Sequence, residues 1–523
     1  MLFQKSGIMK KIIILSAVVL LSNLLLCQTY DYLDRNQIKA MISADGTLFN
    51  TFESGNYRAC FEVPKGLGIN SIFYAGLFIG GFDENSVLRV SGYYFSVKDF
   101  VFGPVASKYS GADYISKYDR VWLVNLSDIE YHYLHYNDIG YEMPKVIQNW
   151  PAHGNTENGE ASDLAPYYDV NGNGYYDPQN GDFPMIRGDQ AIYFIANDAG
   201  GQQATGGLKT GIEVHGMVYC FNPSIGSVLQ QTVFVNYRLI NRSNHNYNNF
   251  YSSMMCDFDL GNLLNDLVGS DSVLNMMYVY NSVGIDSVGA PSYSIGYSNS
   301  PVQGAMILNY PASSIYGNYG MLNTDEDYYN TLLLPEIMIN PVGNYPTNFI
   351  FSGIPEEDEG WFLTSTDTIN MVYDPRMFLS SGPFNFDSGS QMCLDYAFPF
   401  AVDYGGSNME SLAFLREKAE ALQNWFDNQD FSCYGSSLGV LPFNIDKEIV
   451  SIFPNPSNGL IHIGFLSDFS GTATIEVYST DGKIIQKFET AQPENVINID
   501  NPGLYLIVVK YGNKQLIKRV SVL

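Results

Sequence analysis

The sequence predicts a mainly β protein, with a large β-sandwich-like region, one helix near its end, and a second, smaller β-sandwich at the C-terminus. The composition favours strands, because the chain of 523 residues contains 39 tyrosines, 32 phenylalanines and 48 glycines. Aromatic side chains fit the pleated, half-buried surface of a sheet, and glycine, asparagine and proline favour the turns between strands. A chain of this length predicts two to four domains.

Short apolar runs bounded by glycine and proline recur along the chain, as expected for strands. They occupy residues 57–63, 71–83, 191–196, 212–221, 231–239 and 276–280. From them we predict a β-rich domain over 28–150, a second β-rich region over 151–430, a linker over 431–448, and a compact β unit over 449–523.

One segment has helical rather than strand periodicity. In residues 409–428 the apolar side chains recur every three or four positions, with charged side chains between them. Ser407 or Asn408 can cap its first turn. We expect Trp425 and Phe426 to pack this helix against the second β-rich region, which it would close.

The N-terminus is predicted to be an export signal of residues 1–27. Lys10 and Lys11 precede an apolar run over 12–26, which is shorter than the roughly 20 residues of a membrane-spanning helix. Cleavage after Cys27 is the preferred interpretation, and no transmembrane segment is expected in the mature chain. Acylation of Cys27 is the alternative, disfavoured because the preceding residue, Leu26, is not small.

Charge and cysteine spacing exclude several classes of function. The 54 acidic and 27 basic residues give a net charge of −27, which disfavours binding to nucleic acid and to anionic membranes. Such a balance suits either divalent cations or simple solubility. The remaining cysteines lack the close spacing of a zinc site, so we expect buried thiols with one or two disulfides. They are Cys60, Cys220, Cys256, Cys393 and Cys433.

The C-terminal unit carries three motifs in order, at 452–459, 475–483 and 501–509, before a terminal Lys518. Asp481 and Gly482 form a hairpin signal between alternating strands. The unit resembles the type A sorting domain of type IX secretion cargo, an immunoglobulin-like β-sandwich. The alternative is a small immunoglobulin-like module of another purpose.

This resemblance implies export through the outer membrane in Bacteroidota, with the type IX secretion machinery as partner. It also implies removal of the tail at the cell surface, followed by attachment to lipopolysaccharide or release. The part between signal and tail, called the passenger below, resembles uncharacterised cargo of that phylum at residues 75–81, 149–154 and 211–215 and in the loop at Asp169. No activity follows from that resemblance.

Residues 169–182 have the ligand spacing of a calcium loop. Side-chain oxygens at alternate positions, followed by a glycine at the sixth, are typical of such loops. Asn180 stands where a bidentate glutamate would be expected, which lowers the charge of the site. A turn without metal is the alternative. The predicted ligands are Asp169, Asn171, Asn173, Tyr175 through its carbonyl, Asp177 and Asp182.

A second acidic group consists of Asp257, Asp259, Asp266 and Asp271. Strand alternation would place Asp257 and Asp259 on one face, as a second cation site or a pair of glycosidase-type carboxylates. Acidic residues in a solvated loop are the more common explanation.

Two functions remain open from the sequence. The first is a non-enzymatic, calcium-stabilised surface protein that binds surface glycans or lipopolysaccharide. The second is a secreted glycan-degrading hydrolase that uses carboxylates around Asp257 and Asp259. The chain has no GxSxG nucleophile elbow and no phosphate-binding loop, and it identifies no catalytic residue.

Overall fold

The computed structural model describes residues 30–53, 56–94, 97–223, 226–288, 290, 295–317, 324–333, 337–364, 376–429, 431–433, 435–436, 450–453, 457–465, 471–479, 483–511 and 514–522. The predicted export signal and Cys27 lie outside these residues. The chain forms two compact units that divide between Ser437 and Leu438, and each is described by itself. Within the described ranges no helix is long and apolar enough to cross a membrane.

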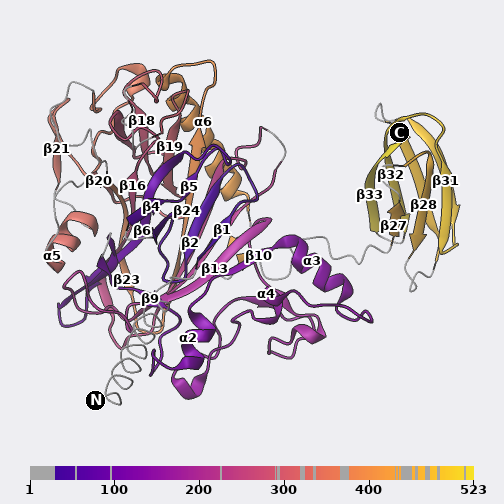
Figure 1. The fold of residues 1–523 in the computed structure, drawn as a ribbon, viewed down its shortest axis with the longest axis horizontal. Helices are drawn as coiled ribbons and strands as arrows, with labels where there is room; N and C mark the ends of the chain where they lie inside the picture. The colour runs from indigo at the N-terminus through magenta and orange to yellow at the C-terminus, as the bar shows by residue number, and fades with distance from the viewer. Residues whose placement is uncertain are drawn as a thin grey trace, which may run out of the picture. The chain divides into compact units, whose positions relative to one another are not determined.

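The passenger is built on two nine-stranded antiparallel sheets among the described residues (Figure 1). The first sheet has the order β1-β2-β5-β6-β16-β23-β20, with β7 paired to β6 and β8 to β7. Its strands are β1 (Tyr30–Leu33), β2 (Lys39–Ser43), β5 (Phe61–Glu62), β6 (Asn70–Phe82), β7 (Leu88–Tyr94), β8 (Val97–Lys98), β16 (Tyr247–Phe258), β20 (Ser314–Gly317) and β23 (Arg376–Phe386).

The second sheet has the order β10-β13-β14-β15-β24-β19-β18-β17, with β9 paired to β13. Its strands are β9 (Val101–Phe102), β10 (Trp122–Asn125), β13 (Gln190–Asn197), β14 (Ile212–Cys220), β15 (Thr232–Asn241), β17 (Asp266–Asp271), β18 (Met276–Asn281), β19 (Val302–Ile307) and β24 (Gln391–Ala401). The predicted segments 28–150 and 151–430 each contribute strands to both sheets. The mainly β fold predicted from composition is therefore confirmed.

The core lies between the two sheets. The ring of Phe398 on β24 contacts that of Phe61 on β5, with ring centroids 6.5 Å apart, and that of Phe49 at 5.2 Å. Strands β13, β14 and β15 are buried at every residue, because their other face is also covered. Strands buried on both faces are continuous apolar runs rather than alternating ones, as in Ala191–Ala196.

Helix α6 (Asn408–Asp427) packs against β18, β19 and β24, as predicted for the segment 409–428 (Figure 1). Ser407 is the N-cap and forms a capping box with Glu410. The ring of Trp425 contacts Phe221 and Phe234, which fixes the end of the helix on the second sheet.

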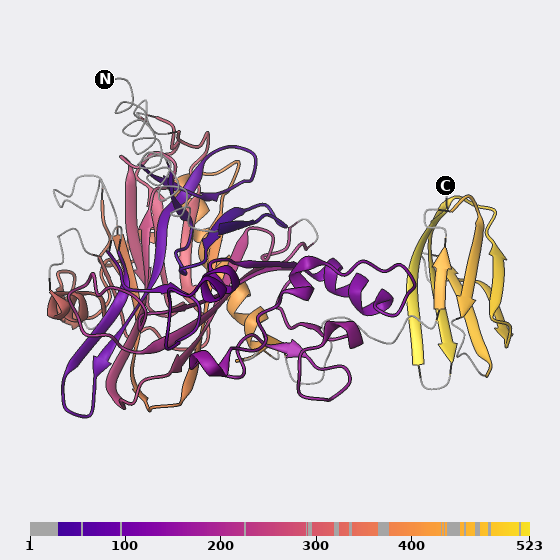
Figure 2. The same cartoon turned by 60° about the horizontal axis from the view of Figure 1, so that its bottom comes forward.

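A segment of short elements lies beside the sheets and carries the candidate calcium loop (Figure 2). It contains α2 (Ala112–Tyr118), α3 (Leu126–His135), α4 (Lys145–Gln148), the short helices η1 (Thr156–Asn158) and η2 (Pro178–Asn180), and strands β11 (Tyr167–Tyr168) and β12 (Phe183–Pro184). The remaining short elements of the passenger are β3 (Asn50–Glu53), β4 (Asn56–Ala59), β21 (Met338–Asn340), β22 (Tyr345–Thr347), α5 (Asp325–Tyr328), η3 (Tyr329–Leu333) and η4 (Pro355–Glu357).

A disulfide fastens the end of the passenger. Cys393 on β24 is bonded to Cys433, which lies between the short strands β25 (Phe431–Ser432) and β26 (Gly435–Ser436). The start of the predicted linker is thus attached to the second sheet, whereas residues 437–449 lie outside the described ranges. Cys220 and Cys256 are buried free thiols.

The C-terminal unit contains a three-stranded sheet, β27-β28-β31, and a four-stranded sheet, β30-β29-β32-β33, among the described residues. One apolar core fills it, with Ile463, Ile475, Val477 and Val509 fully buried. This arrangement agrees with the expected immunoglobulin-like tail. Its strands are β27 (Val450–Phe453), β28 (Leu460–Phe465), β29 (Ala473–Ser479), β30 (Ile484–Thr490), β31 (Glu494–Asn498), β32 (Gly503–Tyr511) and β33 (Lys514–Val522).

Candidate functional site

The predicted calcium loop connects β11 to β12 and folds back on its own side chains. The Asp169 carboxylate accepts hydrogen bonds from the backbone N–H groups of Gly172 at 2.7 Å, Asn173 at 3.1 Å and Gly174 at 2.7 Å. Gly172 and Gly174 have φ angles of +72° and +79°, which favour glycine. The tight curvature therefore depends on glycine at both positions.

Three asparagine amides surround the Asp177 carboxylate. The Nδ2 groups of Asn171 and Asn173 each donate to it at 2.9 Å, and that of Asn180 donates at 2.8 Å. These hydrogen bonds, led by that of Asn180, hold the pKa of Asp177 below its usual range. The carboxylate of Asp177 and three carboxamide groups thus share one small space.

Asp182 is the buried member of the loop. Its carboxylate accepts hydrogen bonds from the N–H groups of Val170 at 2.8 Å and Asp177 at 2.9 Å. Burial, together with the neighbouring Asp177 carboxylate, raises the pKa of Asp182 to about 6. The backbone carbonyl of Asp182 lies 3.0 Å from Nε2 of His132, so α3 supports the loop from behind.

Tyr175 lies at the exposed tip of the loop. Its side chain is 71% exposed, and its N–H donates to Oδ1 of Asn173 at 2.7 Å. The structure therefore brings together the loop residues predicted from the sequence. Across the described ranges, no group of three or more histidine, cysteine, aspartate or glutamate side chains is arranged to hold a metal. A cation here would depend on amide and carbonyl oxygens as well as carboxylates.

The second acidic group divides: burial, to which the charge of Asp259 contributes, raises the pKa of Asp266, whereas Asp257 and Asp271 each have a basic partner of their own. Asp257, on β16, is 2% exposed and forms an ion pair with Arg376 at 3.6 Å. The register of β16 against β6 shifts between Asp257 and Phe258, where the strand ends, so the alternation expected from 257 to 259 is interrupted. Asp266 and Asp271 lie at opposite ends of β17, and Asp271 forms an ion pair with Arg416.

A buried polar network on β13, β14 and β15 was not identified as a site from the sequence. Nε2 of His215 lies 2.9 Å from Glu213, and Nδ1 lies 2.6 Å from the hydroxyl of Tyr193 and 3.2 Å from Nη2 of Arg238. Burial, followed by the charge of Arg238, lowers the pKa of His215 to about 4. The sequence does contain a signal for this network: Glu213 and His215 are two positions apart in a strand, which places both side chains on one face of β14.

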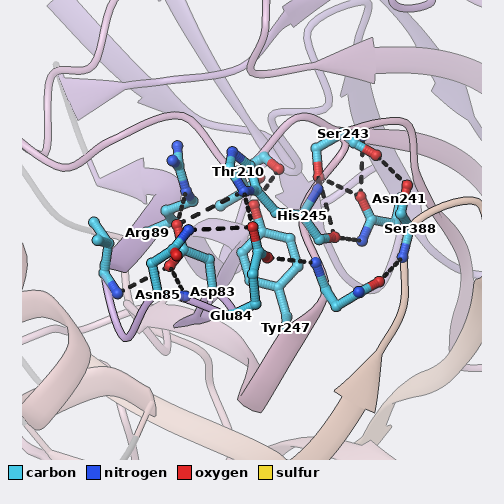
Figure 3. A network of polar contacts seen from close by, with 12 residues as sticks. Asp83, Glu84, Asn85, Arg89, Thr210, Asn241, Ser243, His245, Tyr247 and Ser388 are labelled. Atoms are coloured by element: carbon cyan, nitrogen blue, oxygen red, sulfur yellow. Dashed lines mark hydrogen bonds and ion pairs between the residues drawn. The ribbon is translucent and has the colours of Figure 1, made fainter.

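A second network joins the β6–β7 hairpin turn to the β15–β16 and β23–β24 connections between the two sheets (Figure 3). Asp83, in the turn after β6, accepts from Nε of Arg89 at 3.1 Å, and the neighbouring Glu84 lies 3.1 Å from Nδ1 of His245. The nearby Ser243 hydroxyl donates to Oδ1 of Asn241 at 2.6 Å rather than to the imidazole. The network therefore fastens turns together and lacks the contact between hydroxyl and imidazole that nucleophilic catalysis uses.

Two adjoining hollows lie where α6 begins. One of about 560 Å³ is lined by Phe414, Glu410 and Glu417, and one of about 240 Å³ by Leu67 and Phe400. Val402 and Tyr404 line both hollows, which are together called the α6 groove below. The side chain of Tyr404 is 67% exposed and that of Phe414 is 46% exposed. The α6 groove thus combines exposed rings with carboxylates.

Comparison with known proteins identifies the C-terminal unit. Residues 451–523 match the family described as Secretion system C-terminal sorting domain. No curated protein sequence matches the chain. Among solved structures, one named as a polysaccharide lyase aligns with 65% of this chain and 37% of its own, at 10% identity and a TM-score of 0.19. A similarity this low carries no argument about the passenger.

Proposed function

The protein is a cargo of the type IX secretion system, exported through the outer membrane to the cell surface or beyond by its C-terminal sorting domain, and we propose that its passenger is a calcium-stabilised, non-enzymatic surface module that binds glycans. The secretion machinery is its partner during export. The proposal for the passenger rests on one observation: side chains with oxygen donors lie close together within residues 169–182.

The loop suits Ca²⁺ because its donors are oxygens at short sequence spacing. An asparagine amide that donates its nitrogen to Asp177 presents its oxygen to the same space when the amide turns over. Asp169, Asn171, Asn173 and Asp177 would hold the ion, with Asp182 fixing the backbone behind it. Bound Ca²⁺ supplies charge compensation and cross-linking there.

A calcium site in this loop can function outside the cell even if its affinity is low. Calcium loops of extracellular modules bind with dissociation constants of about 10⁻⁴ to 10⁻³ M, and a site of low charge falls at that end. Asn180, which replaces the expected glutamate, donates to Asp177 in the structure. A weak site still stabilises the passenger outside the cell, where calcium is abundant.

Calcium-dependent unfolding tests this loop. We expect the Tm of the purified protein to fall when calcium is chelated, and to respond less in Asp169→Ala, because the ion stabilises the state that binds it. Gln179→Ala, at an exposed neighbouring position, is the control that keeps the full response. An equal calcium response in the parent and Asp169→Ala would exclude the loop.

The α6 groove is the proposed glycan-binding face. Sugar rings stack on exposed aromatic rings, and carboxylates accept hydrogen bonds from sugar hydroxyls. Tyr404 supplies the ring, with Asp403 and Glu410 beside it. The acidic passenger makes neutral or amine-bearing glycans better ligands than phosphate-rich lipopolysaccharide.

Glycan binding is tested with an array of neutral, acidic and amine-bearing oligosaccharides. Tyr404→Ala should lose at least tenfold in affinity for any bound glycan, whereas Tyr131→Ala, which removes a 47%-exposed ring on α3, should not. Retained binding in Tyr404→Ala would remove this groove from the proposal.

The hydrolase alternative gains no support from the geometry. A glycosidase needs two carboxylates about 5 to 9 Å apart that flank an accessible bond. Asp257 is 2% exposed and its carboxylate forms an ion pair with Arg376. A buried, paired carboxylate is a poor nucleophile for a polymeric substrate.

A further inference from the structure

The crossover between the two sheets contains a second group of buried oxygens. β16 ends at Phe258 in the first sheet, and β17 begins at Asp266 in the second. The N–H of Gly261 in this crossover donates to the carbonyl of Asn70 on β6 at 3.0 Å. The crossover is therefore held against the first sheet while its far end enters the second.

Two buried carboxylates bond to the backbone of this crossover, Asp266 at Leu260 and Asp286 at Asn262. Asp266 and Asp286 are both 0% exposed. Oδ2 of Asp266 accepts from the N–H of Leu260 at 2.9 Å, whereas its Oδ1 has no hydrogen-bond partner. The Asp286 carboxylate accepts from the N–H groups of Asn262, at 3.2 Å to Oδ2, and Tyr297, at 2.5 Å.

Two asparagines complete the group. Asn265 donates through Nδ2 to the carbonyl of Asp286 at 3.1 Å, and its Oδ1 is buried without a partner. Asn281, on β18, is the cross-strand partner of Asp266, so their side chains share one face of the sheet. Both amide atoms of Asn281 are buried without a partner. Asp266, Asn265 and Asn281 thus each have a buried side-chain oxygen without a hydrogen-bond partner.

An uncompensated carboxylate pair is costly in this position. Burial raises the pKa of Asp266 well above its usual range and that of Asp286 to about 7, and no basic side chain of the described residues counters either shift. Buried polar atoms without partners each cost free energy. A cation with oxygen preference would satisfy the charges and the orphaned oxygens together.

We propose that Asp266 and Asp286, with the amide oxygens of Asn265 and Asn281, bind one Ca²⁺ ion that fastens the crossover to the second sheet. The donors are all oxygens, which excludes the nitrogen and sulfur sets of zinc sites. Two carboxylates match the charge of a divalent ion, and Ca²⁺ accepts irregular buried oxygen sets more readily than Mg²⁺. This site shares no residue with the Asp169 loop, and it adjoins the α6 groove, because Tyr297, which donates to Asp286, also lines that groove.

The test measures bound calcium by equilibrium dialysis at a fixed millimolar concentration of free calcium, because a weak loop site would lose its ion if free calcium were removed. We expect about two equivalents in the parent, and about one in either Asp266→Asn or Asp169→Ala, if both sites bind. A parent with one equivalent, lost in Asp266→Asn and kept in Asp169→Ala, would support the crossover site and refute the loop.

A second measurement covers variants that fold poorly. Asparagine is close in shape to a protonated aspartic acid. Asp266→Asn should therefore have the same Tm as the parent in chelator and a lower Tm than the parent in calcium. Ser272→Ala, at an exposed position in the turn after β17, is the control that keeps the parent's calcium response. Unchanged calcium content in both Asp266→Asn and Asp286→Asn, or equal Tm to the parent in calcium, would overturn the proposal.

Discussion

The passenger holds two groups of acidic residues that look alike in the sequence and differ in the fold. In the loop of residues 169–182, carboxylates and amides hydrogen-bond to one another and stay together. In the group from Asp257 to Asp271, Asp257 pairs with Arg376 and Asp271 with Arg416. Carboxylates gather in the glycine-rich turn, whereas Asp257 and Asp271, which lie on strands, take separate basic partners from distant elements.

The comparison predicts its largest effect at Arg416. This side chain joins Glu356 at 2.5 Å, Asp271, and the hydroxyl of Tyr278 at 3.0 Å. Arg416→Ala leaves two partly buried carboxylates together, and we expect a loss of about 4 kcal/mol in the free energy of unfolding. Chemical denaturation measures it, with the exposed Glu420→Ala on α6 as control; a loss below about 1 kcal/mol would mean that Asp271 needs no partner.

The next largest effect is destabilisation of the fold by acid, through the buried imidazole of His215. His215 has a pKa of about 4 in the fold against 6.5 when exposed, so it is kept neutral. Its contribution is fully present above pH 6.5 and is lost as pH falls towards 4, a change of about 3 kcal/mol. Glu213, whose pKa is lowered to about 2, loses its own contribution only below pH 4.5.

The measurement is the free energy of unfolding from pH 7 to pH 4, with His215→Gln as the comparison. The parent should lose stability through this window, and the variant should lose less. Parallel curves for the two proteins would contradict the assignment of the acid sensitivity to His215.

A smaller effect is expected at Asp177. This carboxylate lies among amide groups, whereas Asp271 is paired with an arginine. Asp177→Asn keeps the loop's shape but removes a charge that Asn171, Asn173 and Asn180 approach. We expect a clear loss of stability in calcium and a smaller one in chelator, because only the ion-bound state needs the charge. Paired denaturation curves measure this difference; equal losses in both conditions would make the loop a metal-free turn.

The smallest effect is expected at Tyr175. Its predicted contribution is a backbone carbonyl, and its side chain is 71% exposed. Tyr175→Phe should therefore change stability by less than about 0.5 kcal/mol, with or without calcium. A calcium-dependent loss above about 1 kcal/mol, read from the same unfolding curves, would show that the hydroxyl takes part.

Local signals account for the features that sequence reasoning predicted. The capping box of Ser407 and Glu410, the helical spacing before Asp427, the sorting motifs and the turn at Asp169 each depend on residues close in the chain. Interactions of that kind are formed within a few residues, so spacing alone reveals them. The signal at the N-terminus is also local, although it lies outside the described residues.

Tertiary structure decided what spacing could not reveal. Asp286 meets Asp266 only because the crossover leaves one sheet and enters the other, and Asn281 meets Asp266 only through strand register. Arg416 reaches Asp271 from a helix about 145 residues away. The sequence by itself determined export, the β-rich class and the local loop; pairings between distant strands determined which charges are neutralised, because sheet register and packing are properties of the whole fold.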